Sequence, residues 1–218
     1  QHVLAQNGLG QAFINSLFIT IPATIIPIAV ASFAAYAFAW IRFKWVNWLF
    51  IFVFALQIIP LQMSLVPLLQ IFSTWLRPMQ AWLHDIVPII PEQNYLPLWL
   101  AHAMFGLPLA IFLLHNFIQQ LPRELFEAAR VDGASHFLIF RKLVLPLTVP
   151  AIASFAIFQF LWVWNDLLVA LTFAGGTPDV APITAYLANI KGSYGAQIHL
   201  ITAGAFVAIV VPLIVFFS

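Results

Sequence analysis

The chain has 218 residues, of which 63% are hydrophobic and only 7% carry a charge, with 8 basic against 7 acidic side chains. A soluble domain has roughly 25% charged residues, so this composition, with a mean hydropathy of +1.01, indicates a membrane protein. A formal net charge of +1 provides no basic field for nucleic acid. The absence of cysteine excludes disulfides, thiolate zinc sites and cysteine nucleophiles.

Five stretches are long and apolar enough to cross a hydrocarbon core, which needs roughly 20 helical residues. In chain order they are 12–40, 46 to about 72, 96–117, 147 to about 173, and 199–218. Prolines recur inside them, and the carbonyls that a proline leaves unpaired in a bilayer must be satisfied by neighbouring helices, by Ser or Thr, or by water. We therefore predict an all-α membrane protein, a polytopic helical bundle that forms one membrane domain over residues 1–218.

Basic residues divide unevenly between the connections on the two sides of these spans. One side has six of them: Arg42, Lys44, Arg123, Arg130, Arg141 and Lys142. The other side has only Arg77 and Lys191. Because Lys and Arg near span ends are retained in the cytoplasm, the side with six is predicted to be cytoplasmic. The connections at about 73–95 and 174–198 are then external loops.

The cytoplasmic connection at about 119–146 predicts two short helices. Pro122 suits a first helical position and Arg130 a last turn, which predicts a helix from about Arg123 to Val131. Gly133 should end this helix, because glycine most easily adopts the left-handed conformation of a C-terminal cap.

Ser135 is predicted to cap a second helix that runs to about Leu143, and Pro146 marks the return to the membrane. Isolated helices this short are marginal in water. Each must therefore pack against the ends of the spans or against a cytoplasmic partner.

Three short stretches of this connection resemble the EAA motif of the permease subunits of binding-protein-dependent ABC importers. In that family the motif forms coupling helices that sit in a cleft of the ATPase and transmit its closure to the membrane spans. The residues that the resemblance assigns to this coupling are Glu127, Ala128, Ala129, Asp132, Gly133, Ala134, Leu145 and Pro146. The resemblance covers nearly the whole chain. Within the family, the chain is similar to the carbohydrate-uptake, maltose-type branch, and this similarity implies the fold of type I ABC importer permeases.

This resemblance implies import of a sugar or oligosaccharide by alternating access in a bacterial or archaeal cytoplasmic (inner) membrane. It implies as partners a second permease subunit, two ATPase subunits and an extracytoplasmic sugar-binding protein. ATP and Mg are expected on the ATPase, since the chain has no phosphate-binding GxxxxGK[ST] loop. The chain itself is then not an enzyme and binds no cofactor or metal. Family members usually have six spans, so a sixth is expected before residue 1, and a cytoplasmic tail after Ser218.

The stretch "WVWND" is the candidate substrate pathway, since flat aromatic faces stack on sugars while Asn and Asp bind hydroxyls. Its candidate residues are Trp162, Trp164, Asn165 and Asp166. Aromatic residues also collect at bilayer interfaces, and an acid inside a membrane can mark a proton relay. The alternative is therefore a secondary, proton-coupled transporter that uses Asp166, and a third hypothesis is an intramembrane hydrolase.

The external stretch "TFAGGTPDVAPIT" looks most like α-glucoside permeases. It resembles the loop that reaches toward the sugar-binding protein, and the candidate contacts are Gly175, Gly176, Thr177 and Pro178. The segment from His84 to Tyr95 is longer than the usual external loop of the family. The six histidines are scattered, and hydrogen bonds from His102 and His115 to neighbouring helices are favoured over a metal site.

Overall fold

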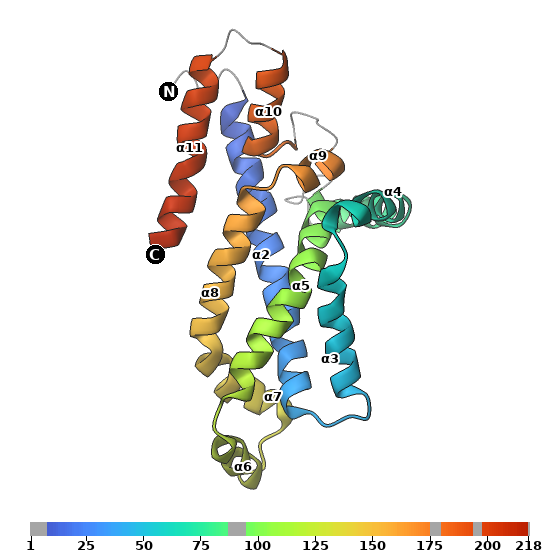
Figure 1. Ribbon diagram of the computed structural model, residues 1–218, viewed down its shortest axis with the longest axis vertical. Coiled ribbons are helices and arrows are strands. Elements are labelled where there is room, and N and C mark those ends of the chain that lie inside the picture. The colour runs from blue at the N-terminus through green and yellow to red at the C-terminus, as the bar shows by residue number, and fades with distance from the viewer. Residues whose placement is uncertain (1–7, 87–94, 175–179, 194–197, 218) are drawn as a thin grey trace. The chain divides into compact units, whose positions relative to one another are not determined.

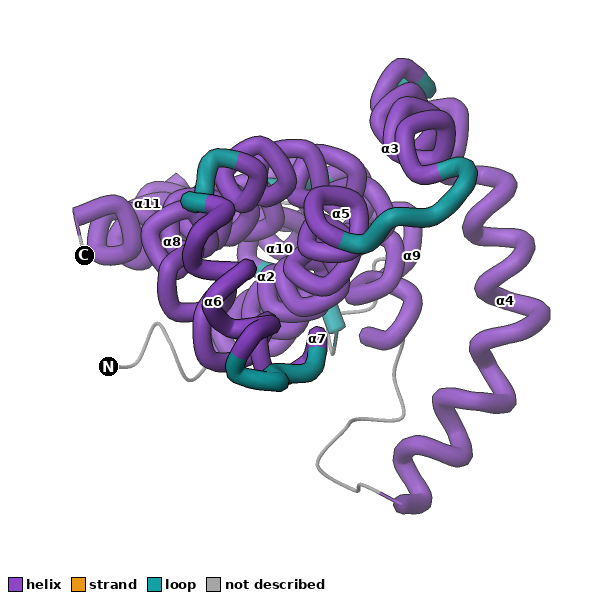
Figure 2. The backbone as a smooth tube through the Cα atoms, turned by 90° about the horizontal axis from the view of Figure 1, so that it is seen from below, coloured by secondary structure: helices purple, strands orange, loops and turns teal. Residues whose placement is uncertain are grey.

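The computed structural model describes residues 8–86, 95–174, 180–193 and 198–217 (Figure 1). Within these ranges all regular structure is helical, and Figure 2 draws no described segment as a strand. In chain order the helices are α2 (Leu9–Trp40), α3 (Val46–Ala55), the 3₁₀ turn η1 (Leu56–Ile58), α4 (Leu61–Ile86), α5 (Tyr95–Gln119), α6 (Arg123–Val131), α7 (His136–Ile139), the π turn η2 (Phe140–Val144), α8 (Leu145–Trp164), α9 (Leu168–Ala174), α10 (Ile183–Ser193) and α11 (Ile198–Phe217). The all-helical class predicted from composition is confirmed.

In the part of the chain that the structure describes, three helical stretches are long and apolar enough to cross a membrane: α2, α5 and the continuous helix His136–Trp164. The predicted first and third spans are confirmed within a few residues at each end. Among the described residues, α11 contributes a shorter apolar helix, Ile201–Phe217. The count of five spans stays a prediction.

The predicted second span is not one straight helix. Val46–Ile58 and Leu61–Leu76 meet at an angle of 101°. The bend lies at Ile59, whose backbone is extended with ψ 117°, directly before Pro60. A proline disfavours the helical conformation of the residue before it, so the break is encoded locally. The second arm then continues to Ile86, and residues 73–86 are helical where the sequence predicted an external loop.

The predicted fourth span is also shorter than expected. Helix α8 ends at Trp164, and the chain breaks before the separate short helix α9. The predicted external loop 174–198 contains a further helix, α10, which sequence reasoning missed because glycine and proline surround it. Both differences arise where a polar or proline-containing turn interrupts an apolar run.

Contacts group the chain into two compact units, which we describe separately. The first unit comprises residues 1–24, 61–103 and 159–218, and the second comprises residues 25–60 and 104–158. Helices α2, α5 and α8 each contribute residues to both units. The single membrane domain over residues 1–218 stays a prediction.

In the first unit, polar side chains of α2 hold the segment that leads into α10. The Asn15 side-chain amide donates to the carbonyl of Ala181 over 3.1 Å. The backbone N–H of Ile183 donates to the Ser16 hydroxyl over 2.8 Å. Both side chains are buried, so their bonds replace water that they lose on folding. These two contacts fix the start of α10 against the membrane-spanning helix.

The core of the second unit forms between α2, α5 and the segment α6 to α8. Its fully buried members include Ala35 of α2, Leu114 of α5, Phe126 of α6 and Val144 of η2. Because α6 and η2 contribute side chains to this core, the connection that was predicted to be cytoplasmic is part of the folded unit.

Candidate functional site

Helix α6 is held to the second unit by its one buried side chain, Phe126, which is 1% exposed. The phenyl ring stacks on the indole of Trp40, with ring centroids 3.6 Å apart and an interplanar angle of 13°. The indole Nε1 of Trp40 in turn donates to the carbonyl of Ile118 over 3.3 Å. One aromatic stack therefore connects α6 to the ends of α2 and α5. The packing that a short helix requires is supplied by the chain's own spans.

The C-terminus of α6 has the capping geometry that the sequence predicts. Gly133 has a φ of 77°, in the left-handed region. Its N–H donates to the carbonyl of Arg130 over 3.0 Å, and the N–H of Ala134 donates to the carbonyl of Ala129 over 2.9 Å. These two bonds together form a Schellman motif. A β carbon at Gly133 would meet no atom within 4 Å, so glycine is needed for its backbone conformation alone.

The second predicted helix begins at the expected cap. The Ser135 hydroxyl accepts from the N–H of Leu138 over 3.3 Å, and α7 starts at the next residue. The chain turns sharply between α6 and α7, as the loop between them in Figure 2 shows. The hydroxyl of Tyr36 on α2 lies 3.0 Å from Nδ1 of His136, the first residue of α7. Helices α6 and α7 therefore both contact α2.

The second helix does not end near Leu143 as predicted. It passes through the π turn η2, in which the N–H of Leu145 donates to the carbonyl of Phe140, and continues directly as α8. Pro146 lies inside this continuous helix and has no N–H to donate to the preceding turn, and the π turn η2 directly before it interrupts the regular hydrogen-bond ladder at this place. Leu145 and Pro146 therefore belong to a membrane helix that is continuous with the predicted coupling loop.

The structure separates the three residues Glu127, Ala128 and Ala129 between two faces of α6. Ala129 is partly buried against the core of the second unit. Glu127 lines a pocket of that unit. Ala128 is exposed and does not line the pocket. At 100° per residue, Ala128 shares the opposite face with Leu125, which is 40% exposed.

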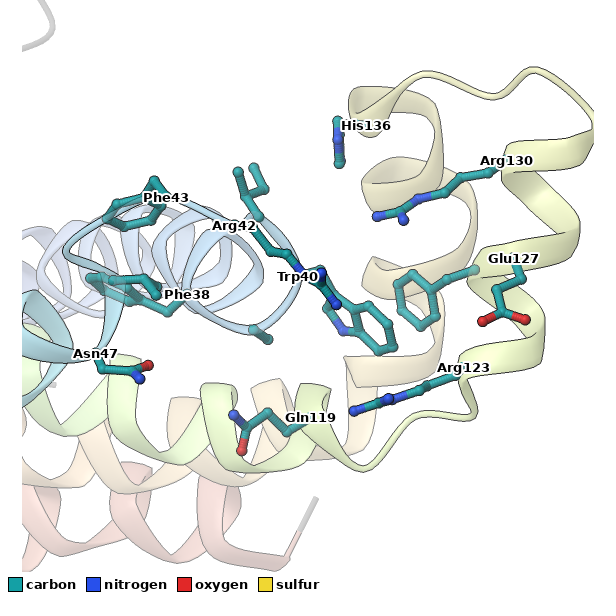
Figure 3. A pocket seen from close by; sticks show the side chains of 14 residues that line it. Phe38, Trp40, Arg42, Phe43, Asn47, Gln119, Arg123, Glu127, Arg130 and His136 are labelled. Atoms are coloured by element: carbon teal, nitrogen blue, oxygen red, sulfur yellow. The ribbon is translucent and has the colours of Figure 1, made fainter.

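The pocket has a volume of about 1110 Å³ and lies within the second unit (Figure 3). It is formed by the end of α2, the turn into α3, the end of α5, and α6 with the first residue of α7. The lining residues are Phe38, Ala39, Trp40, Ile41, Arg42, Phe43, Val46, Asn47, Gln119, Arg123, Phe126, Glu127, Arg130 and His136. Arg42, Arg123 and Arg130, which the sequence placed in two different connections on one side, all line this pocket.

The candidate substrate residues occupy contrasting environments in the first unit. Trp164 is 2% exposed, and its Nε1 donates to the carbonyl of Ala208 over 2.9 Å. Phe160 stacks on its ring and Phe13 meets it edge to face. Its ring is thus covered by protein in this arrangement. Asn165 is exposed, and its amide donates to the carbonyl of Leu161 over 2.7 Å.

Asp166 has a local structural role. Its carboxylate accepts from the N–H of Ala170 over 3.0 Å at the start of α9. Its backbone carbonyl accepts from the hydroxyl of Thr184, over 2.7 Å, which links the turn to α10. Asp166 Oδ2 also lies 3.8 Å from Nε2 of His102. The carboxylate therefore caps a helix, as Asp commonly does.

A buried polar cluster surrounds this turn. Trp162 is partly exposed and meets the imidazole of His102 edge to face, with centroids 6.0 Å apart. Gln159 is 0% exposed and donates to the carbonyl of Ala23 over 3.3 Å. Sequence reasoning missed Gln159, although an amide in an otherwise apolar span is itself a signal. The substrate roles of Trp162, Trp164, Asn165 and Asp166 stay predictions.

Two further predictions concern ligands and partners. Gly175, Gly176, Thr177 and Pro178, the candidate contacts with the sugar-binding protein, lie outside the described residues. Within the described ranges, no group of three or more His, Cys, Asp or Glu side chains could hold a metal ion.

The helical fold matches that of a crystallised bacterial ABC transporter that imports the acidic polysaccharide alginate. The TM-score is 0.67 over 95% of this chain and 76% of that chain, at 20% identity. Residues 27–218 match the family described as "Binding-protein-dependent transport system inner membrane component". The chain therefore belongs to this family of inner-membrane ABC importer permeases, and it is a transport component rather than an enzyme.

Two curated relatives extend this similarity. The chain is 55% identical to the osmoprotective compounds uptake permease protein GgtD of Synechocystis sp., over 99% of this chain and 68% of the relative. It is 51% identical to the alpha-glucoside transport system permease protein AglG of Rhizobium meliloti, over 99% of this chain and 54% of that relative. The chain thus spans about two thirds of one relative and about half of the other.

Proposed function

We propose that this chain couples ATP hydrolysis on separate ATPase subunits to the import of a sugar or oligosaccharide by alternating access. The single observation that carries the proposal is the geometry of α6. One face of the helix is anchored to the spans by Phe126, and the opposite face carries exposed Leu125, Ala128 and, at its end, Val131. Val131 is 88% exposed, the highest exposure of any large hydrophobic side chain that the structure describes. A partner that binds this face would move the ends of α2 and α5 with it.

The proposed assembly has this chain beside a second permease subunit, above two ATPase subunits, in a bacterial or archaeal cytoplasmic membrane. ATP and Mg bind to the ATPase, and this chain binds no cofactor. An extracytoplasmic sugar-binding protein delivers the substrate on the other side. The family description, which names binding-protein-dependent transport and the inner membrane, supports this arrangement.

An α-glucoside is the proposed substrate class. The 51% identity to a permease named for alpha-glucoside transport supports this choice over other sugars. The 55% identity to a permease named for the uptake of osmoprotective compounds makes such compounds the second class of substrate to test.

Proton-coupled transport through Asp166 remains the rival hypothesis. Its carboxylate accepts from the N–H of Ala170 at the start of α9 and so already has a structural task. This observation favours the ATP-driven reading, since the cap explains an acid at this position without a proton relay.

The experiment that tests the proposal is uptake by the purified assembly in proteoliposomes. The full permease, expressed with its neighbouring transport genes, should co-purify with an ATPase in a fixed ratio. With the binding protein present, it should import a labelled α-glucoside only when ATP and Mg are supplied on the ATPase side. Uptake that needs no ATP and is abolished by a protonophore would contradict the proposal.

A further inference from the structure

The pocket beside α6 contains an unusual concentration of unpaired positive charge. Arg42, Arg123 and Arg130 line it, against the single carboxylate of Glu127. The guanidinium groups of these three arginines form no ion pair and no hydrogen bond with another residue that the structure describes. A guanidinium presents five donors in a rigid fork that matches phosphate. The pocket thus offers an anionic group several donors that the protein leaves unused.

The orientation of α6 indicates what kind of ligand these arginines meet. Arg123, Phe126 and Arg130 lie within one sector of the helix, since residues three, four and seven apart share a face. Phe126 on this sector is buried against Trp40, so the sector faces the chain's own second unit. Figure 3 shows Arg123 and Arg130 extending from α6 toward the side on which Gln119 and Trp40 lie. A protein partner that docked on the opposite face of α6, the face that carries Ala128, would leave these arginines unpaired.

The remaining walls of the pocket suit a ligand with both a polar and an apolar part. Asn47, Gln119 and His136 supply neutral hydrogen-bonding groups. Ile41 and Phe43, which are 36% and 40% exposed, lie where the apolar helix α2 ends. Basic pockets at the cytoplasmic ends of membrane helices commonly bind the headgroups of anionic lipids.

We propose that this pocket binds a phosphate-bearing anion, the headgroup of an acidic phospholipid of the cytoplasmic leaflet. The phosphate lies among the guanidinium groups of Arg42, Arg123 and Arg130, and the acyl chains leave past Ile41 and Phe43. A bound headgroup bridges the α2–α3 turn to α6 and so stiffens the link between α6 and the spans. The inference rests on the proposed function only for its cytoplasmic orientation.

The test is native mass spectrometry of the full transporter complex in detergent, titrated with phosphatidylglycerol or with phosphatidylcholine. The double variant Arg42→Gln/Arg130→Gln should bind phosphatidylglycerol about 30-fold more weakly than the parent, which is the effect expected for two basic residues near an anionic headgroup. The matched control, Arg141→Gln/Lys142→Gln, removes the same charge from residues that do not line the pocket. It should bind within about threefold of the parent. Arg42→Lys/Arg130→Lys, which keeps the charge, should recover part of the lost affinity.

The outcomes separate the sources of the anion. Competition by millimolar inorganic phosphate, with no preference for phosphatidylglycerol over phosphatidylcholine, would overturn the lipid proposal and assign the site to a soluble phosphate ion. An equal loss of affinity for phosphatidylglycerol in the pocket and control variants, or no loss of affinity in either, would overturn the proposal. Loss of the ATPase with unchanged lipid binding would show that the arginines bind the ATPase, and would likewise overturn it. Because lipid is counted independently of uptake, failure here is distinguishable from failure of the proposed transport function.

Discussion

The indole of Trp40, the last residue of α2, lies parallel to the ring of Phe126 in α6 with ring centroids 3.6 Å apart. We therefore expect a displacement of α6 to move the end of α2, a helix long and apolar enough to span a membrane. Interiors are close-packed and transmit strain, so a stacked pair of this kind acts as a rigid connection.

Phe126→Ala should weaken the mechanical link between the ATPase and the membrane spans. Removal of a buried aromatic ring costs about 3–5 kcal/mol, and here the loss falls on the contact that orients α6. We expect binding-protein-stimulated ATP hydrolysis and sugar uptake in proteoliposomes to fall at least tenfold, while the complex still inserts in the membrane.

The matched control is Phe137→Ala, one helix further along. Phe137 is 64% exposed, so the same truncation leaves no cavity. Equal loss of coupling in both variants would show that the stack with Trp40 has no special role.

Gly133→Val should impair coupling through backbone strain alone. The left-handed φ of 77° costs a β-branched residue about 1–2 kcal/mol, although the space around the glycine is open. Gly133→Asn is the control, because Asn adopts this conformation more easily. We expect stimulated ATPase activity to fall severalfold in the valine variant and to stay near normal in the asparagine variant. If both variants behave like the parent, the angle between α6 and α7 does not matter for coupling.

Asp166→Asn and Asp166→Ala should behave differently. Asparagine caps a helix about as well as aspartate, whereas alanine loses the cap of α9 at a cost of about 1 kcal/mol. ATP-driven uptake should therefore survive in the asparagine variant and fall in the alanine variant. A proton relay predicts the opposite for asparagine, which cannot titrate. Abolished uptake in Asp166→Asn, with normal protein abundance, would support the proton-coupled alternative.

Gly204→Val should loosen α11 from its neighbours in the first unit. A β carbon at this position would lie 2.5 Å from Cδ2 of Leu187 and 3.3 Å from Cδ1 of Leu9. We expect a lower thermal midpoint for the purified protein. Adding Leu187→Ala to the Gly204→Val variant should restore much of the lost thermal stability, because it removes Cδ2 of Leu187, the atom that clashes with the new β carbon. Failure of this second change to restore stability would show that α11 does not pack as described.

The sequence predicted the local structure of the coupling segment well, and the reason is physical. Residues within a few positions in the sequence determine where α6 begins and ends, why Gly133 is left-handed and why Ser135 caps α7. Pro60 likewise carried a local signal for the bend, since it disfavours a helical Ile59, but the continuous apolar run around it favoured one span.

The contacts between residues far apart in the chain could not be predicted from the sequence. Nothing in the chain pattern indicates that Trp40 and Phe126, 86 positions apart, stack on each other. The same holds for the meeting of Arg42 with Arg130 in one pocket. The resemblance grouped Glu127 with Ala128 and Ala129, whereas a helix places three consecutive residues 100° apart and so on different faces.

The most direct test of the account asks what touches the free face of α6. Residues 1–218 contain no cysteine. In an assembly that has been cleared of all other reactive cysteines, Ala128→Cys can therefore be modified alone with a maleimide photo-cross-linker. Ile14→Cys, at a position on α2 that is 50% exposed, serves as the control. We predict a covalent product between residue 128 and the ATPase subunit, and none from residue 14. An assembled, active complex in which residue 128 yields no product with the ATPase would contradict the account.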